Sequence, residues 1–166
     1  STISATSGGI TLTGVGGASS GDNNHGVFLA AAAEALAGSG GLAIEGSGGG
    51  SGVDTDNNDG ARATGGATMR SGAGPLTIVG QGGNGASSEG IALLSTNTIG
   101  ASAGVSGQTG PITLTADDYY FSTTQTVNTT GAVTIEPKST SFAGSPTDAI
   151  SELSFPDVTS LTLGKP

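Results

Sequence analysis

A short strand pattern that recurs six times constrains the fold of this chain more than any other feature. Each copy alternates apolar and mostly polar residues over a few positions beside glycine or proline, which is typical of a short strand with one buried face. The copies begin at Ile10, Leu42, Leu76, Ile112, Val133 and Leu161. A pattern that returns this often predicts a repeat architecture.

The spacing of the copies predicts what the repeat unit is. Successive copies are 32, 34, 36, 21 and 28 residues apart, and two more strand-like stretches follow most of them. The shortest spacing is close to one bare coil of a solenoid, about 20 residues. The second stretch begins at Val27, Ala61, Ile91 and Tyr119, and the third lies around Leu36, Met69, Ile99 and Val127, with Ile3 at the third position of a preceding turn.

Three short strands per repeat predict an all-β parallel β-helix of about five coils. Aliphatic residues at equivalent positions of successive coils would then stack into ladders, and the threonines between them would face outward. The two ladders of the first strand are Ile10, Leu42, Leu76, Ile112, Val133 and Leu161, and Leu12, Ile44, Ile78, Leu114, Ile135 and Leu163.

The variable part of each repeat follows its first strand. Residues 15–24, 47–59 and 81–89 are rich in Gly, Ser, Asn and Asp, the residues of turns that need positive φ or local side-chain hydrogen bonds. We therefore expect loop insertions on one side of the rod. The glycines of residues 48–52 lack the lysine and helix of a phosphate-binding loop, so they are interpreted as a turn.

Two stretches depart from the regular pattern. Residues 30–37 have the strongest helix propensity in the chain, but their counterparts at 65–69 and 96–101 are poor helix formers, so we predict a loop and short strand. Residues 1–166 are interpreted as one segment, an excerpt or repeat unit of a longer chain. Residues 137–166 would form a divergent terminal coil, and neither end shows an obvious cap.

Composition excludes several classes of function. The chain has 32 glycines, no cysteine and a net charge of −9, with Arg62, Arg70, Lys138 and Lys165 as its only fixed cations. So acidic a chain is a poor binder of nucleic acid or anionic lipid, and it offers no thiolate metal site. No apolar run approaches the ~20 residues that span a bilayer, so membrane insertion is not expected.

The strand motifs resemble a known family. The Gly-(Ile/Leu)-Thr-(Leu/Ile) strands, residues 111–118, residues 131–137 and the closing residues 155–164 resemble the repeat regions of large filamentous-haemagglutinin-like adhesins. The resemblance implies a right-handed parallel β-helix from a bacterial protein, secreted by the two-partner route to the cell surface. It also implies a non-enzymatic shaft or fibre segment that meets flanking repeats or other copies end to end, with surface glycans as candidate ligands.

One polar cluster offers hard oxygen ligands for calcium. It runs from Asp54 to Gly60, but its glycine falls one place late for an EF-hand loop and its twelfth position is Gly65 rather than an acid. An Asx-rich turn is the alternative, and no other cofactor is predicted. The candidate ligands are Asp54, Asp56, Asn58 and Asp59, with Asp22, Asn23 and Asn24 of the neighbouring coil as second contributors.

The remaining chemistry is sparse. A carbohydrate-active β-helix enzyme would need clustered acids and a basic residue, for which Arg62 and Arg70 beside the acids of residues 54–59 are the only candidates. The only histidine, His25, is expected to be exposed in its loop. Tyr119 or Tyr120 could face outward and stack on sugar, and the alternation leaves open which one is core.

Overall fold

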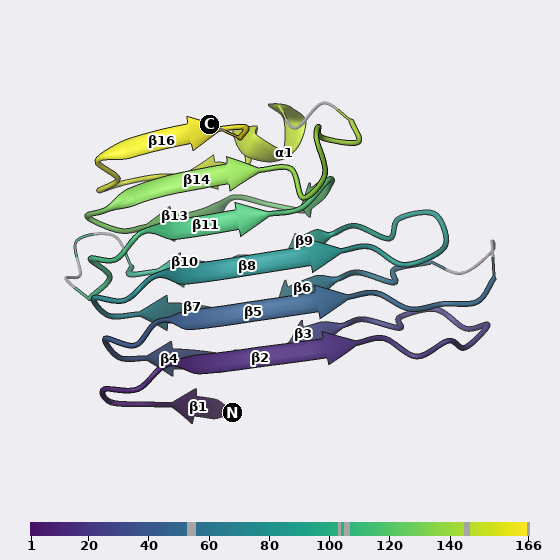
Figure 1. Ribbon diagram of the computed structural model, residues 1–166, viewed down its shortest axis with the longest axis horizontal. Coiled ribbons are helices and arrows are strands. Elements are labelled where there is room, and N and C mark those ends of the chain that lie inside the picture. Colours follow the sequence, from purple (N-terminus) through teal and green to yellow (C-terminus); the bar gives the residue numbers. More distant parts are fainter. Residues whose placement is uncertain (53–55, 103, 105–106, 145–146, 166) are drawn as a thin grey trace.

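The computed structural model describes residues 1–52, 56–102, 104, 107–144 and 147–165. The chain is a right-handed parallel β-solenoid of about five turns, with three strands per coil in three parallel sheets. Figure 1 shows the coils stacked one above another, with the sheet formed by the first strand of each repeat in front and the loops that follow these strands projecting to the right. The predicted fold class is confirmed.

Successive strands of each sheet come from successive coils and pair in parallel. Sheet A contains β1 (Thr2–Ser4), β4 (Glu34–Ala37), β7 (Thr68–Ser71), β10 (Thr98–Gly100), β13 (Gln125–Asn128) and β15 (Leu153–Ser154). Sheet B contains β2 (Ile10–Val15), β5 (Leu42–Ser47), β8 (Leu76–Gln81), β11 (Ile112–Thr115), β14 (Ala132–Glu136) and β16 (Ser160–Leu163). Sheet C contains β3 (Val27–Leu29), β6 (Ala61–Thr64), β9 (Ile91–Leu94) and β12 (Tyr119–Phe121).

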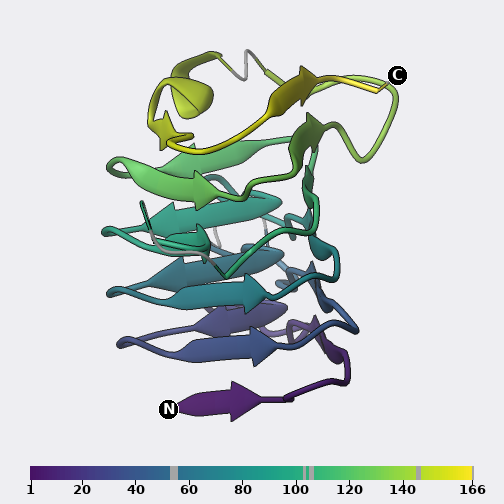
Figure 2. The same ribbon diagram turned by 90° about the vertical axis from the view of Figure 1, so that its left-hand side faces the viewer.

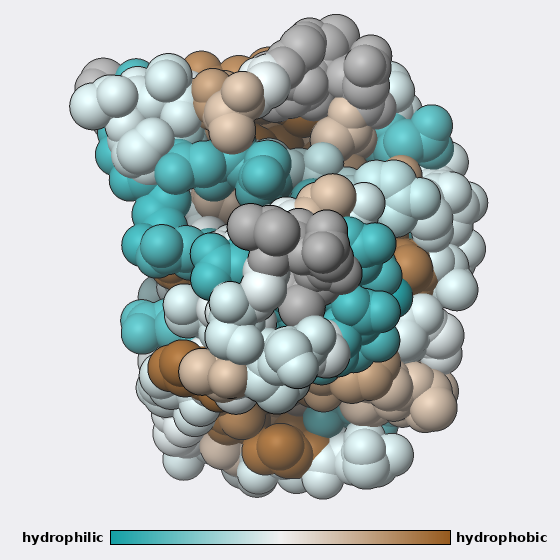
Figure 3. Space-filling model, turned by 90° about the vertical axis from the view of Figure 1, so that its right-hand side faces the viewer, coloured by the Kyte–Doolittle hydropathy of each residue, from teal (hydrophilic) through white to brown (hydrophobic). Residues whose placement is uncertain are grey.

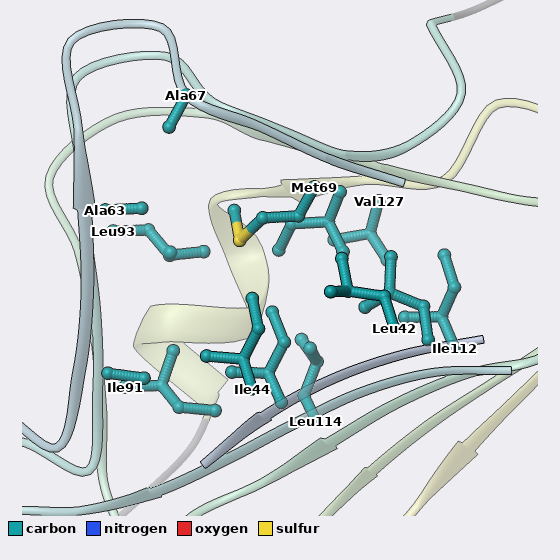
Figure 4. Packing of buried hydrophobic residues seen from close by; sticks show 14 of the residues in the cluster. Leu42, Ile44, Ala63, Ala67, Met69, Ile91, Leu93, Ile112, Leu114 and Val127 are labelled. Carbon is teal, nitrogen blue, oxygen red and sulfur yellow. The ribbon is translucent and has the colours of Figure 1, made fainter. Parts of the chain in front are cut away.

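The aliphatic ladders predicted for sheets B and C are confirmed by the strand register. Leu42 pairs with Ile10 and Leu76, and Ile135 pairs with Leu114 and Leu163. The ladder residues of the inner coils are buried and fill a narrow core between the three sheets (Figure 4). Each aliphatic side chain buried in this way stabilises the fold by roughly 1.5–3 kcal/mol.

The prediction for the third strand is wrong by one residue in the second coil. Ala35, not Leu36, pairs with Met69 and Ile3 and is fully buried, whereas Leu36 pairs with Arg70 on the outer face. The strand could in principle face the core with either set of alternate residues. Turning Leu36 inward would also turn Glu34 inward. An unpaired buried carboxylate costs more than the smaller apolar surface of alanine, so the alanine phase wins.

Residues 30–33 form a turn, as predicted, and not a helix. Ala31 and Ala32 have φ of 51° and 56° in the left-handed region, and β4 begins directly after them at Glu34. The turn joins sheet C to sheet A. Helix propensity is a weak preference here, because the repeat imposes a corner at this position in every coil.

Three loops stack into a layer beside the core, which we call the loop stack: residues 16–25, residues 48–52 with 56–59, and residues 82–89. The outgoing arm of each upper loop donates to the returning arm of the loop below, from Gly49 N to Asn24 O and from Gly83 N to Asn58 O, both at 2.8 Å. The loops therefore extend the stacking of the coils.

Close approach explains the glycines at the root of the loop stack. A Cβ at any of these positions would overlap the carbonyl oxygen of the returning arm of the same loop, and none has positive φ. The expectation that loop glycines serve positive-φ turns is wrong for the three of these that lie in the predicted loops, Gly16, Gly48 and Gly82. The six root glycines are Gly14, Gly46 and Gly80, and, two residues further on, Gly16, Gly48 and Gly82.

The last coil differs from the others, as the sequence suggested for this region. Among the described residues sheet C has four strands; the short helix α1 (Thr147–Ser151) lies against β12 where a fifth would follow, before β15 and β16 continue sheets A and B. Figure 2 shows α1 at the top of the stack and β1 alone at the bottom. The expectation of no cap missed this helix.

Replacing Gly46 with alanine should destabilise the fold by about 2–3 kcal/mol, because the new methyl group overlaps the carbonyl oxygen of Gly60 and forces the backbone apart. The matched control is Gly17→Ala, where the nearest atom to the new methyl group is Asn24 Oδ1 at 3.7 Å. Urea unfolding of both variants checks the prediction, and equal losses would contradict the close-approach explanation.

Candidate functional site

The root of the loop stack gathers polar side chains from three successive coils. His25, Asp59 and Glu89 each lie two residues before the first residue of a sheet C strand, and those strands pair in register. The three residues therefore form a polar ladder along the stack axis, where the loops return to sheet C.

Asp59 is the centre of this ladder. Its side chain is fully buried, Oδ2 lies 2.8 Å from Nη1 of Arg62, and Oδ1 accepts the backbone N–H of Glu89 at 3.1 Å. A buried carboxylate is tolerated when a cation and hydrogen bonds replace its hydration. Arg62 and Asp59 thus form an internal ion pair, which is not available to an external ligand.

His25 is buried, so the expectation of an exposed histidine is wrong. Its side chain is 7% exposed, and Nδ1 accepts the N–H of Asp59 at 3.3 Å. Its ring packs on the ring of Phe28, with the two ring centroids 5.1 Å apart. Burial lowers the pKa of His25 and outweighs the opposing charge of Asp59. Because Nδ1 accepts a hydrogen bond, it carries no proton and the ring is neutral. The 3.5 Å distance between Nδ1 and Asp59 Oδ2 is therefore not an ion pair.

Glu89 lies beside the buried Asp59 carboxylate. Burial raises the pKa of Glu89 to about 7, and the side-chain interaction with Asp59 and the negative charges of Asp59 and Asp118 act in the same direction. Two carboxyl groups form a hydrogen bond only when one of them is protonated. Below this pKa the protonated Glu89 carboxyl is therefore able to donate a hydrogen bond to Asp59.

Asn58 holds the three loops together. Its side chain is fully buried; Oδ1 accepts the N–H of Asn24 at 2.8 Å, and Nδ2 donates to the carbonyl oxygen of Asn84 at 2.7 Å. Each partner belongs to a different loop of the stack. The amide thus satisfies backbone groups that the sheet hydrogen bonds do not reach.

The predicted calcium ligands occupy different surroundings. Asp54 lies outside the described residues, Asp56 is exposed with its backbone N–H bonded to Asp22 Oδ1 at 2.9 Å, and Asn23 has φ of 62°. Asn58 and Asp59 use their oxygens inside the loop stack. Over the described ranges, no three acidic or histidine side chains are grouped as a metal site, and the calcium site stays a prediction.

The structure separates the two arginines of the predicted enzyme cluster. Arg62 pairs with Asp59 beside sheet C, whereas Arg70 lies on β7 of sheet A, beside Leu36 on the outer face. A hollow of about 350 Å³ lies above the third loop and is lined in part by Asp117 and Asp118. Both carboxylates already accept backbone N–H groups, from Ser139 and Gly90.

The two tyrosines divide between core and surface. Tyr119 packs against the core, and its hydroxyl accepts the N–H of Ala116 at 2.9 Å and lies 3.0 Å from the carbonyl oxygen of Leu114. Tyr120 is 48% exposed on the outer face of sheet C. Tyr120 is therefore the residue available to an external ring.

Sequence reasoning missed Glu89 and a set of buried amides at the corners. Asn97 Oδ1 accepts the N–H of Ala67 at 3.0 Å, and Gln125 Oε1 accepts the N–H of Asn97 at 3.0 Å, which continues the same corner from coil to coil. Gln108 does the same for Ser71 at the corner between sheets A and B. The available signal was position: Asn97 and Gln125 each stand directly before a threonine of sheet A, and these threonines, Thr98 and Thr126, pair in register.

Comparisons with known proteins find no match for this chain. No protein-family model, no curated protein and no solved structure matches the chain. In the described part of the chain, no helix is both long and apolar enough to cross a membrane.

Replacing Glu89 with glutamine should flatten the dependence of stability on pH. The folded pKa of Glu89, about 7, exceeds its ordinary value of 4.5, so its stabilisation is complete below pH 4.5 and is lost as the pH rises to 7. Because Glu89 is only half-buried, screening reduces the effect to about 1–2 kcal/mol. The glutamine amide can still donate to Asp59 without titrating.

Urea unfolding at pH 5 and pH 8 checks this difference. The parent chain should lose more stability over this interval than the Glu89→Gln variant, and Glu45→Gln, at an exposed position of β5, controls for the loss of one charge. Equal losses in the parent chain and the Glu89→Gln variant would contradict the raised pKa of Glu89.

Calcium should leave the melting temperature unchanged, because Asn58 and Asp59 already use their oxygens in the loop stack. Thermal melts in excess EDTA and in millimolar calcium chloride check this expectation. A higher melting temperature in calcium that is lost in the Asp56→Asn variant would support the calcium site instead.

Proposed function

We propose that this chain is a structural shaft segment of a secreted or cell-surface adhesin and that it is not an enzyme. The observation that carries the proposal is where the polar chemistry lies. The one buried ion pair in the described part of the chain, Asp59 with Arg62, lies within a single coil, and the buried amides of Asn58 and Asn97 join neighbouring coils. These buried contacts stabilise the stacked coils and leave few polar groups to bind a substrate.

The continuity of the ladders supports the same role. Sheets A and B keep a parallel register from the first coil to the last, and each coil rests on its neighbours through backbone hydrogen bonds and core contacts. A solenoid of this kind gains stability from each added coil, so its length can vary without a change in its cross-section. That property suits a spacer.

The surface supports display. Figure 3 shows a loop-side face that is mostly hydrophilic or near neutral, with separate apolar patches. On sheet C, Phe28 and Tyr120 are 51% and 48% exposed, and exposed rings of this kind are able to stack on sugars. Surface glycans are accordingly the proposed ligands of the shaft wall, and the resemblance to adhesin repeats supports an extracellular location.

Single-molecule stretching between the two termini tests the shaft role. The hydrogen bonds between coils run along the stack axis, so tension should peel one coil at a time. Each step should release the 21–36 residues that separate successive sheet B strands, or roughly 70–120 Å of chain. Unfolding in one event without steps, or cleavage of a polysaccharide by the intact chain, would contradict the proposal.

A further inference from the structure

We propose that the hollow above the third loop binds one neutral sugar residue of a surface glycan. The inference rests on the proposed function, which names surface glycans as ligands, and it assigns one of them to the loop stack. The hollow lies between parts of residues 80–90 and the side chains of Asp117 and Asp118. Its volume of about 350 Å³ is within the usual range of small-ligand sites, about 300–1,000 Å³.

The hollow exists because the fourth coil has only a short connection where the lower coils have a loop. Between the lower loops, Gly50 N donates to Gly17 O at 2.9 Å, and Asn84 N donates to Gly49 O at 3.0 Å. The fourth coil continues sheets B and C above the third, but residues 116–118 alone connect β11 to β12. The third loop is therefore uncovered in the middle of the described fold, with paired strands above and below it.

The uncovered loop offers both donors and acceptors to the hollow. The carbonyl oxygen of Gly83 is the counterpart of Gly49 O, and that of Ser88 is the counterpart of Asn58 O. Among the described residues, neither Gly83 O nor Ser88 O accepts a hydrogen bond, and the N–H groups of Gly82 and Ser88 have no acceptor. These half-buried backbone groups need partners from solvent or from a ligand.

Two carboxylates add charged acceptors to the lining. Oδ1 of Asp117 accepts the N–H of Ser139 at 2.6 Å, and Oδ1 of Asp118 accepts the N–H of Gly90 at 2.7 Å. These bonds hold both carboxyl groups in place. The Oδ2 atoms of Asp117 and Asp118 accept no hydrogen bond from the described residues, so each carboxylate keeps one oxygen for a ligand.

The side-chain amide of Gln81 adds a donor. Its Oε1 accepts a hydrogen bond from Lys138 Nζ at 2.7 Å. An ammonium group can only donate, so the oxygen end of the amide faces Lys138. The nitrogen Nε2, at the other end of the amide, is left to donate to a ligand in the hollow, which Gln81 lines.

A sugar ring matches this mixed lining better than a charged or apolar ligand. Each sugar hydroxyl both donates and accepts, so neighbouring hydroxyls can donate to a carboxylate and accept from a backbone N–H or from the Gln81 amide. Asp117 and Asp118 repel an anion, and an apolar ligand would leave the backbone groups without partners. A metal ion would gain nothing from the N–H donors.

The position of the carboxylates also favours a compact ligand over an extended peptide. Asp117 and Asp118 come two and three residues after the end of β11, where the outgoing arm of a fourth loop would begin. A peptide that continued the loop stack would have to run past these two side chains. A single sugar ring fits between them and the third loop without extending further.

Amide chemical shifts in nuclear magnetic resonance spectra test the site on the isotope-labelled chain. The probes are the methyl glycosides of glucose, galactose, mannose and N-acetylglucosamine, each titrated separately. At least one glycoside should shift the amide signals of Gly82, Gly83 and Ser88 and reach saturation. Gly16 and Gly17, at the first loop of the same stack, should respond little.

Asp117→Asn should weaken this binding about tenfold or more, because it replaces the free acceptor oxygen with an amide donor and keeps the oxygen that Ser139 uses. Asp56→Asn removes the same charge from an exposed position of the second loop, outside the hollow, and should bind like the parent chain. Gln81→Ala changes an exposed side chain and should weaken binding about threefold, which gives a second measurement if Asp117→Asn alters the fold.

The outcomes separate this site from the shaft role. The absence of a saturable shift with all four glycosides would overturn the site, as would shifts confined to Phe28 and Tyr120 on sheet C. A response of the hollow to calcium chloride but to no glycoside would replace the sugar with a cation and overturn the proposal. Stepwise unfolding of single molecules tests the shaft independently, so its presence or absence does not depend on these results.

Discussion

Parallel hydrogen bonding between neighbouring coils is the constraint on which the rest of this structure depends. It fixes each residue beside the residue one coil away, so a position repeats its surroundings through the whole stack. At the core positions of sheet B, an aliphatic residue in one coil meets an aliphatic residue in the next, as Leu42 and Leu76 show. Corners and loops repeat in the same way, with Asn97 below Gln125 at one corner and glycine above glycine at the root of the loop stack.

The strands were predictable because their signal is local and repeated. Two aliphatic positions in each sheet B strand, spaced by two residues, fix both the face and the register, and Gly or Pro directly precedes every one of these strands except β16. The signal fails where both faces are apolar: β4 offers Ala35 and Leu36, and only the cost of burying Glu34 decides between them. Helix α1 was missed because one short helix has no repeat to reveal it.

The polar ladder was not predictable from local sequence. His25, Asp59 and Glu89 look like ordinary polar loop residues, and only the stacking of three coils buries them together. The run from Asp54 to Gly60 drew attention because its acids are close in sequence. In the structure its described members diverge: Asp56 faces solvent, while Asp59 faces Arg62. Proximity along a loop is a poor guide to ligand sets when alternate residues point to opposite sides.

The loop stack shows why variation in this fold is confined to certain places. The loop of the fourth coil shrinks to residues 116–118, yet β11 and β12 keep the register of β8 and β9. The coil tolerates this loss because its large core side chains, such as Ile112 and Leu114, come from the strands. The glycines at the root are different: Gly46 and Gly80 are needed only where a returning arm passes close by, so they belong with the long loops. In the fourth coil, Ala116 stands at the corresponding position and is fully buried. Loop length and residue size at this column therefore change together, while the ladders that hold the coils do not.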